Sequence, residues 1–131
     1  MDIDFGDNYQ LFVEASRWMG TPYKLGGNDL SGVDCSGLTK KIYARVFDIE
    51  LSRRSIDQLN KDCHKYPTHS QLQQGDLVFF SSPSSNGLCT HVGVYLKQNK
   101  FIHASTSRGV MVSQLDNPYW GKYWIVGGRV R

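Results

Sequence analysis

One cysteine in this sequence stands where a polar loop gives way to an apolar pattern of helical period. It is the second residue of Asp34-Cys35-Ser36-Gly37. The unpaired N–H groups at the start of a helix favour a thiolate and can also stabilise a tetrahedral oxyanion. A thiolate beside an imidazole attacks carbonyl carbon efficiently. Cys35 is therefore a candidate nucleophile, although a buried structural cysteine would fit this short motif equally well.

Two histidines are candidates for the base that would activate this thiol. His91 and His103 lie in the apolar segments 91–96 and 101–104, which have the composition of neighbouring strands. Two strands can bring two side chains onto one face of a sheet, where one imidazole acts as the base and the other orients it. The remaining two histidines lie in a polar connection, and we interpret them as surface residues.

The geometry of this pair depends on the turn between the two strands. Side chains alternate along a strand, so a symmetrical two-residue turn would point His91 and His103 to opposite faces. We predict a three-residue loop at 97–99 with Asn99 at positive φ, because this loop shifts the register by one residue. Gly93 would then face His103, and the two imidazoles would lie within hydrogen-bonding reach.

The same three side chains could instead bind a metal ion. Cys35, His91 and His103 would supply three zinc ligands and leave a position for water. The chain lacks closely spaced ligand pairs and has no CxxC motif, which disfavours a metal site. Cys63 and Cys89 are either buried thiols or a disulfide pair that leaves Cys35 as the odd thiol.

The pattern of apolar residues changes from helical in the first half of the chain to extended in the second half. Asp7 is placed to cap the first helix. Helices are predicted over 7–19, from Cys35 onward and over 53–62, and strands over 77–80, 91–96, 101–104, 110–113 and 123–130. This order indicates an α+β domain in which the N-terminal helices pack on an antiparallel sheet.

Length and composition limit the classes of protein that fit. The 131 residues suit one domain, and we expect 1–131 to form it. The net charge of +3 comes from scattered residues, so no nucleic-acid-binding arm is indicated. No run approaches the ~20 apolar residues of a membrane span. The acidic start has no signal-peptide pattern, so we expect either a removed leader or another export route.

Six motifs in order make the sequence resemble the NlpC-type cell-wall peptidases, a family of papain-like cysteine endopeptidases. The resemblance covers residues 10 to 131, and 107–111 with 115–117 further resemble the lipoprotein branch of the family. The motifs are Gly20-Thr21-Pro22-Tyr23, Gly26-Gly27, Asp34-Cys35-Ser36-Gly37-Leu38, Gly75-Asp76-Leu77-Val78-Phe79-Phe80, His91-Val92-Gly93-Val94-Tyr95 and Phe101-Ile102-His103-Ala104-Ser105.

The resemblance implies a role for each matching residue. Cys35 matches the nucleophile, His91 the general base and His103 the third, orienting residue. Tyr23 matches a tyrosine whose hydroxyl helps to stabilise the oxyanion. No cofactor and no metal are implied. Asp34 and Ser36 match positions that line the groove and can receive the amino end of a wall peptide.

The implied substrate is the stem peptide of peptidoglycan, cut between the side-chain carboxyl of D-glutamate and a diamino acid. The implied location is the cell envelope, the periplasm or the exterior. If the protein is a toxin delivered into competitors, an inhibitor or immunity protein is an expected partner. Two other readings stay open: an amidase or acyltransferase with the same Cys–His pair, and a wall-binding module with an inactive site.

Overall fold

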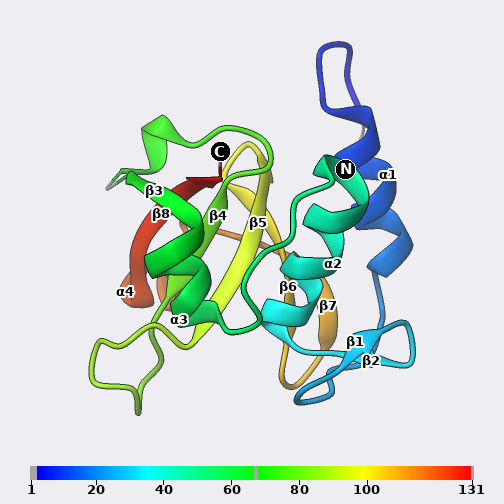
Figure 1. Ribbon diagram of the computed structural model, residues 1–131. Coiled ribbons are helices and arrows are strands. Elements are labelled where there is room, and N and C mark those ends of the chain that lie inside the picture. Colours follow the sequence, from blue (N-terminus) through cyan, green and yellow to red (C-terminus); the bar gives the residue numbers. More distant parts are fainter. Residues whose placement is uncertain (1–2, 67, 131) are drawn as a thin grey trace.

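The computed structural model describes residues 3–66 and 68–130, which form one large sheet with helices on both faces (Figure 1). All neighbouring strands of this six-stranded sheet are antiparallel. Their order is β3 (Cys63–Tyr66), β8 (Trp124–Val130), β4 (Leu77–Phe80), β5 (His91–Lys97), β6 (Lys100–Ser105) and β7 (Gly109–Gln114). The predicted α+β class with an antiparallel sheet is confirmed.

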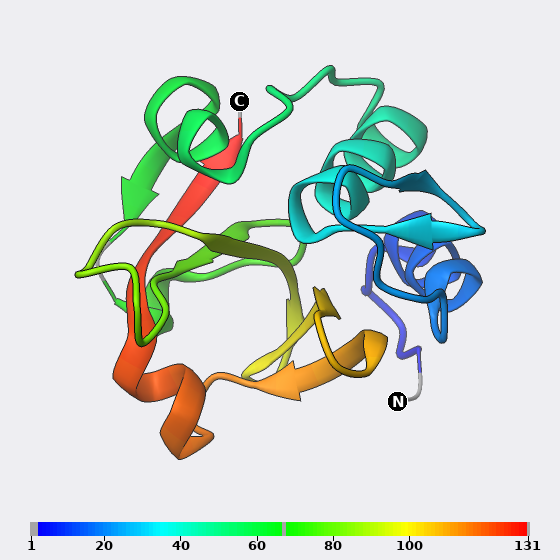
Figure 2. The same cartoon turned by 90° about the horizontal axis from the view of Figure 1, so that it is seen from below.

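A smaller sheet and four α-helices complete the fold of the described residues. Strands β1 (Asn28–Asp29) and β2 (Gly32–Val33) pair with each other beside α2, as Figure 2 shows. The helices are α1 (Tyr9–Trp18), α2 (Cys35–Phe47), α3 (Ser55–Asp57) and α4 (Pro118–Tyr123). A π-helical turn, Gln58–Asp62, continues α3, and a 3-10 turn covers His69–Gln71. Among the helices of the described residues, none is both long and apolar enough to cross a membrane.

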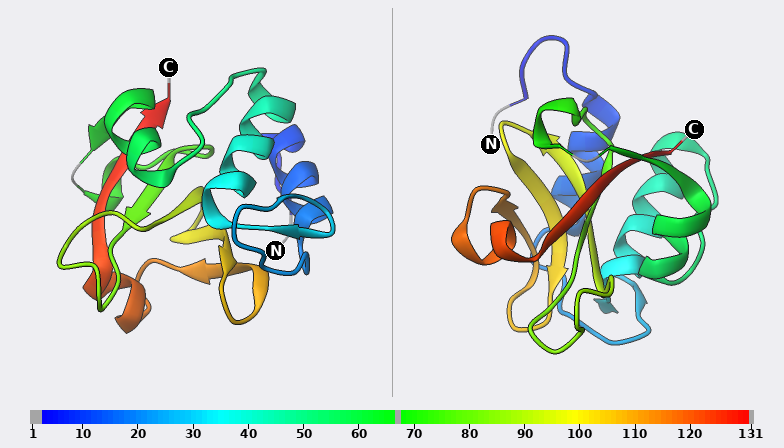
Figure 3. Two further views of the ribbon diagram at one scale, coloured as in Figure 1. Left: turned by 60° about the horizontal axis from the view of Figure 1, so that its bottom comes forward. Right: turned by 90° about the vertical axis from the view of Figure 1, so that its left-hand side faces the viewer.

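The two faces of the large sheet bury different side chains, because residues alternate along each strand. One face packs against α1 and α2, where Phe79 and Ile102 are fully buried against Leu38. The other face buries Phe80 and Phe101 beneath aromatic side chains from 118–124. Figure 3, right panel, shows α4 on the opposite side of the sheet from α2. The core is therefore divided by the sheet into two layers.

Residues near the N-terminus depart from one prediction. Asn8 caps α1, and its side-chain oxygen accepts a hydrogen bond from the Leu11 N–H at 3.0 Å. Asp7, predicted as the cap, instead contacts the Lys97 ammonium and accepts a hydrogen bond from Gln74 at 2.7 Å. The Asp7 carboxylate thus forms a long-range ion pair instead of the helix cap that the local sequence predicts. The next residue, Asn8, has the same capping chemistry.

The hairpin between β5 and β6 confirms the predicted register through a different turn. Gln98 and Asn99 both have positive φ, +54° and +63°, as in a two-residue type I′ turn. The predicted three-residue loop is therefore wrong, since Lys97 pairs with Lys100. A bulge between Tyr95 and Lys97 supplies the one-residue shift, so that Val94 pairs with Ile102.

Candidate active site

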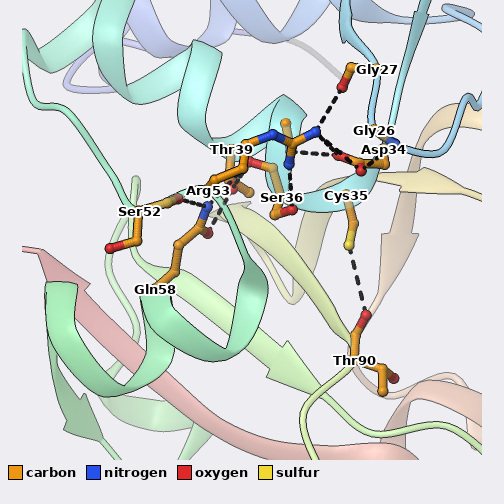
Figure 4. Close-up of polar contacts among 11 residues, drawn as sticks. Gly26, Gly27, Asp34, Cys35, Ser36, Thr39, Ser52, Arg53, Gln58 and Thr90 are labelled. Atoms are coloured by element: carbon orange, nitrogen blue, oxygen red, sulfur yellow. Dashed lines mark hydrogen bonds and ion pairs between the residues drawn. The ribbon is translucent and has the colours of Figure 1, made fainter.

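Cys35 is the first residue of α2, as the sequence predicted. Its side chain is 8% exposed, and its sulfur lies 3.8 Å from the carbonyl oxygen of Thr90, just before β5 (Figure 4). Burial raises the pKa of the thiol to about 11, while the backbone N–H of Val92 lowers it. Thr90 and Val92 flank His91, so the sulfur lies against the strand segment that carries the proposed base.

Asp34 and Ser36, on either side of Cys35, are held in a polar network with Arg53 (Figure 4). The Asp34 carboxylate caps α2 by accepting hydrogen bonds from the N–H groups of Gly37 and Gly26, each at 2.8 Å. Arg53 forms an ion pair with Asp34 at 3.1 Å and donates to the Ser36 hydroxyl at 2.9 Å. Asp34 and Ser36 are both nearly buried. Their hydrogen bonds and the ion pair with Arg53 hold the first turn of α2 in place.

A second buried side chain supports the same turn of α2 from behind. Gln58 is fully buried in the π-helical turn and donates hydrogen bonds to the carbonyl oxygens of Ser36 and Ser52, at 3.2 and 2.9 Å. Its side-chain oxygen accepts from the Thr39 hydroxyl at 2.8 Å. Every polar atom of the amide is paired, and the first turn of α2, which carries Cys35, therefore has a rigid support.

His91 and His103 meet on one face of the sheet. Their Nε2 and Nδ1 atoms are 2.9 Å apart, which confirms the predicted hydrogen-bonding distance. Gly93 permits this approach, because a Cβ atom there would lie 2.8 Å from the Ile102 carbonyl oxygen and 3.2 Å from the His103 Cβ. The other ring nitrogen of His103, Nε2, is 2.7 Å from the Ser113 hydroxyl. The three side chains form a continuous hydrogen-bonded chain.

The direction of this chain determines whether His91 can act as a base. If His91 Nε2–H donates to His103 and His103 Nε2–H donates to Ser113, then Nδ1 of His91 carries a free lone pair. If both bonds run the other way, Nδ1 carries the proton and cannot accept another. Only the first direction produces a base, and Ser113 is compatible with it because its hydroxyl can accept a hydrogen bond from the buried His103.

Both imidazoles are neutral at neutral pH. Burial lowers the pKa of His91 to about 4. Burial, together with the charge that His91 would carry, lowers the pKa of His103 to about 3. Trp120 of α4 contributes to this burial by stacking on His91, with ring centroids 5.1 Å apart and an interplanar angle of 22°. At neutral pH the thiol and both imidazoles are therefore uncharged.

Tyr23, twelve residues before Cys35 in the sequence, is brought close to it in the fold. It pairs through an isolated parallel bridge with Val33, two residues before Cys35. Burial raises the pKa of its hydroxyl, and negative charge on Cys35 or Asp34 would raise it further. The hydroxyl therefore keeps its proton at neutral pH and can donate a hydrogen bond to an oxyanion.

A groove of about 700 Å³ opens beside the two histidines, with His91, His103 and Ser113 among its lining residues. The turn between β6 and β7 forms one wall and α4 forms another. Within the described residues, no three His, Cys, Asp or Glu side chains form a metal-binding group. Cys63 and Cys89 are free thiols, as is Cys35.

Sequence reasoning missed Arg53, Gln58, Ser113 and Trp120. Ser113 falls in a strand that was predicted, and strand parity could have placed it on the face of His103, because His103 pairs with Met111 two residues earlier. Arg53 and Gln58 carry no such signal, since a long connection brings them back to α2. The short helix that presents Trp120 was not predicted.

A thiol at a helix N-terminus that packs against an antiparallel sheet, together with a histidine pair on that sheet, is the arrangement of papain-like cysteine peptidases. The chain belongs to the NlpC/P60 family, whose pattern matches residues 20–129. This finding confirms the resemblance seen in the sequence motifs.

Individual relatives agree with this membership. The chain is 45% identical over 118 residues to a probable endopeptidase of Haemophilus influenzae, covering 88% of this chain and 71% of that protein. It is 40% identical over 121 residues to the murein DD-endopeptidase MepS/murein LD-carboxypeptidase of Escherichia coli K12, covering 92% and 62%. A crystal structure of an NLP/P60 family lipoprotein-like protein from Staphylococcus aureus superposes with a TM-score of 0.81 at 32% identity, covering 99% of this chain and 43% of the other. The chain thus spans less than half of that structure.

Proposed function

We propose that this protein is a cysteine endopeptidase that hydrolyses peptide bonds in the stem peptides of peptidoglycan. The observation that carries the proposal is the 2.9 Å contact between His91 and His103 beside the Cys35 helix. Relatives whose names include murein endopeptidase and NlpC endopeptidase support the choice of substrate. The same relatives support action in the cell envelope or periplasm.

In the acylation step, the Cys35 sulfur attacks the scissile carbonyl carbon while the thiol proton passes to the His91 nitrogen that does not contact His103. The carbonyl oxygen becomes an oxyanion, which the N–H groups at the start of α2 and the Tyr23 hydroxyl stabilise. Collapse of this intermediate breaks the C–N bond. His91 returns its proton to the departing amine, and the acyl group stays on sulfur as a thioester.

In the deacylation step, water attacks the thioester and His91 takes up one of its protons. The C–S bond breaks, the carboxylate product leaves, and the proton returns to sulfur. His103 holds the His91 ring in one tautomer through both steps, so it acts as a positioning residue. Asp34 and Ser36 lie beside Cys35 and outside the lining of the groove beside the histidines, and they are proposed to receive the amino end of the peptide on the acyl side.

The proposed bond is the one between the D-glutamate side chain and the diamino acid. A gamma-DL-glutamyl hydrolase of Bacillus subtilis, 35% identical over 108 residues that make up 25% of its length, supports this choice. The name of the E. coli relative points to a second bond, the DD cross-link between neighbouring stems. Both bonds have the diamino acid on the leaving side.

Digestion of purified peptidoglycan, followed by mass spectrometry of the products, tests the activity and the bond together. We expect a new amino group on the diamino acid and no activity in Cys35→Ser, because a hydroxyl is a far weaker nucleophile at this pH. Cys63→Ser is the matched control and should keep its turnover. Hydrolysis by Cys35→Ser would contradict the proposal, and transfer of the acyl group to an added amine would favour the acyltransferase reading.

A further inference from the structure

The groove beside the histidines has a feature that the proposed reaction does not use. Arg108 is its one Lys or Arg side chain, and no Asp or Glu lines it. His91 and His103 are neutral, because burial lowers the pKa of each well below 7. Among the residues that the structure describes, none forms an ion pair with Arg108. The groove therefore carries one unpaired positive charge.

The backbone around Arg108 is fixed before any ligand binds. The Ser105 hydroxyl accepts a hydrogen bond from the Arg108 N–H at 3.3 Å. Gly109 follows with a φ of +79°, and a Cβ there would lie 2.4 Å from the Thr21 carbonyl oxygen. The same oxygen accepts a hydrogen bond from the Val110 N–H at 2.9 Å. The turn that presents Arg108 is thus tied to the segment leading to Tyr23.

The position of the groove relative to the catalytic pair decides which part of the substrate it would hold. His91 and His103 line the groove, whereas Cys35 and Tyr23 do not. The acyl half of the substrate becomes bonded to sulfur, and His91 gives its proton to the amine of the other half. The leaving half must therefore lie against His91, on the side of the groove.

We propose that Arg108 forms a carboxylate-binding subsite on the leaving-group side and selects stem peptides whose diamino acid carries a second, free carboxylate. This inference rests on the proposed function. Diaminopimelate has such a carboxylate, whereas lysine, or diaminopimelate with that carboxyl amidated, does not. A guanidinium binds carboxylate through two parallel hydrogen bonds, and the hydroxyl groups of Ser105 and Ser107 lie on the same wall.

The test measures binding separately from hydrolysis. Cys35→Ala protein is titrated calorimetrically with the tripeptide L-alanyl-γ-D-glutamyl-diaminopimelate and with the same peptide amidated at the second carboxyl. We expect the amidated peptide to bind about tenfold more weakly, the scale of one lost charge-assisted hydrogen bond. Arg108→Gln in this background should bind both peptides equally, at the weaker affinity. Arg108→Lys should keep part of the preference, because it retains the charge.

Lys122→Gln is the matched control, since it removes a positive charge from α4 outside the groove lining. It should leave the preference intact. Equal binding of the two peptides by the Cys35→Ala protein, or an unchanged preference in Arg108→Gln, would overturn the subsite. Hydrolysis of peptidoglycan by the wild-type protein is scored on its own. If the preference is absent but the wild-type protein hydrolyses peptidoglycan, only the subsite is refuted. If the preference is present but there is no hydrolysis, only the proposed function is refuted.

Discussion

Removal of the Ser113 hydroxyl tests whether the hydrogen-bonded chain sets the tautomer of His91. The hydroxyl lies 2.7 Å from His103 Nε2, and His103 has no exposed surface. In Ser113→Ala, the direction that makes His91 a base leaves the buried His103 Nε2–H without its acceptor. A buried donor that loses its partner costs about 1–3 kcal/mol. Reversal of both hydrogen bonds leaves a lone pair without a donor instead, which costs less than an unpaired N–H, and places the proton on His91 Nδ1.

The expected loss of activity follows from this cost. The difference between the two directions is therefore at most about 1–3 kcal/mol. Since about 1.36 kcal/mol is a factor of ten, the population of the basic tautomer, and with it kcat/KM, should fall by up to roughly fivefold to 150-fold. The assay is hydrolysis of a purified stem peptide, combined with ¹⁵N NMR of the histidine rings. In the wild-type protein, His91 should carry its proton on Nε2. In Ser113→Ala, the signal of the Nδ1–H form should grow in proportion to the lost activity.

Two variants separate this effect from general damage to the groove. Ser113→Thr keeps the hydroxyl on a strand residue and should retain most of the activity. Ser107→Ala removes a groove hydroxyl that does not contact either imidazole and should leave the His91 tautomer unchanged. A wild-type tautomer and wild-type kcat/KM in Ser113→Ala would refute the role of the chain. So would a loss of activity with no change in the ring signals.

Three further outcomes follow from the site. Because burial lowers the pKa of His91 to about 4, the base stays neutral from neutral pH down to that value, so kcat/KM should fall on the acid side near pH 4 and not near 6.5. Tyr23→Phe should lower kcat roughly tenfold to a thousandfold with little change in melting temperature, whereas near-normal turnover would make Tyr23 only a wall of the groove. Gly93→Ala should destabilise the fold by about 1–3 kcal/mol in urea titrations, because its methyl group overlaps the Ile102 carbonyl oxygen, and should reduce activity further by displacing His103.

The helices and strands that carry the reaction were predictable because their patterns are local. The start of α2 at Cys35 and the strand at His91 each follow from a change of period at a polar loop. The strand register that brings His91 next to His103 was also predicted, although a different turn produces it. A three-residue loop and a two-residue turn with a bulge shift the register equally, so the parity argument cannot distinguish them.

The elements that the sequence did not predict depend on contacts between segments that are far apart in the sequence. Strand β3 (Cys63–Tyr66) is polar and half exposed, and it is a strand because it pairs with β8 at the edge of the sheet. The π-helical turn at Gln58 widens the helix where that side chain reaches the carbonyl of Ser36. Neither contact leaves a periodic signal in the sequence. Local patterns thus located the elements that present Cys35 and His91 but not the side chains that support them.

The short helix α4 covers the histidine pair although it is itself a small and partly exposed element. It contains six residues, none of them fully buried, yet its Trp120 covers one face of the His91 ring. A helix of this length is not stable by itself and can open while the large sheet stays folded. Each opening would hydrate His91, and its affinity for protons would return toward that of a free imidazole. Heat inactivation could therefore begin as a reversible loss of the base, at temperatures where the protein as a whole is still native.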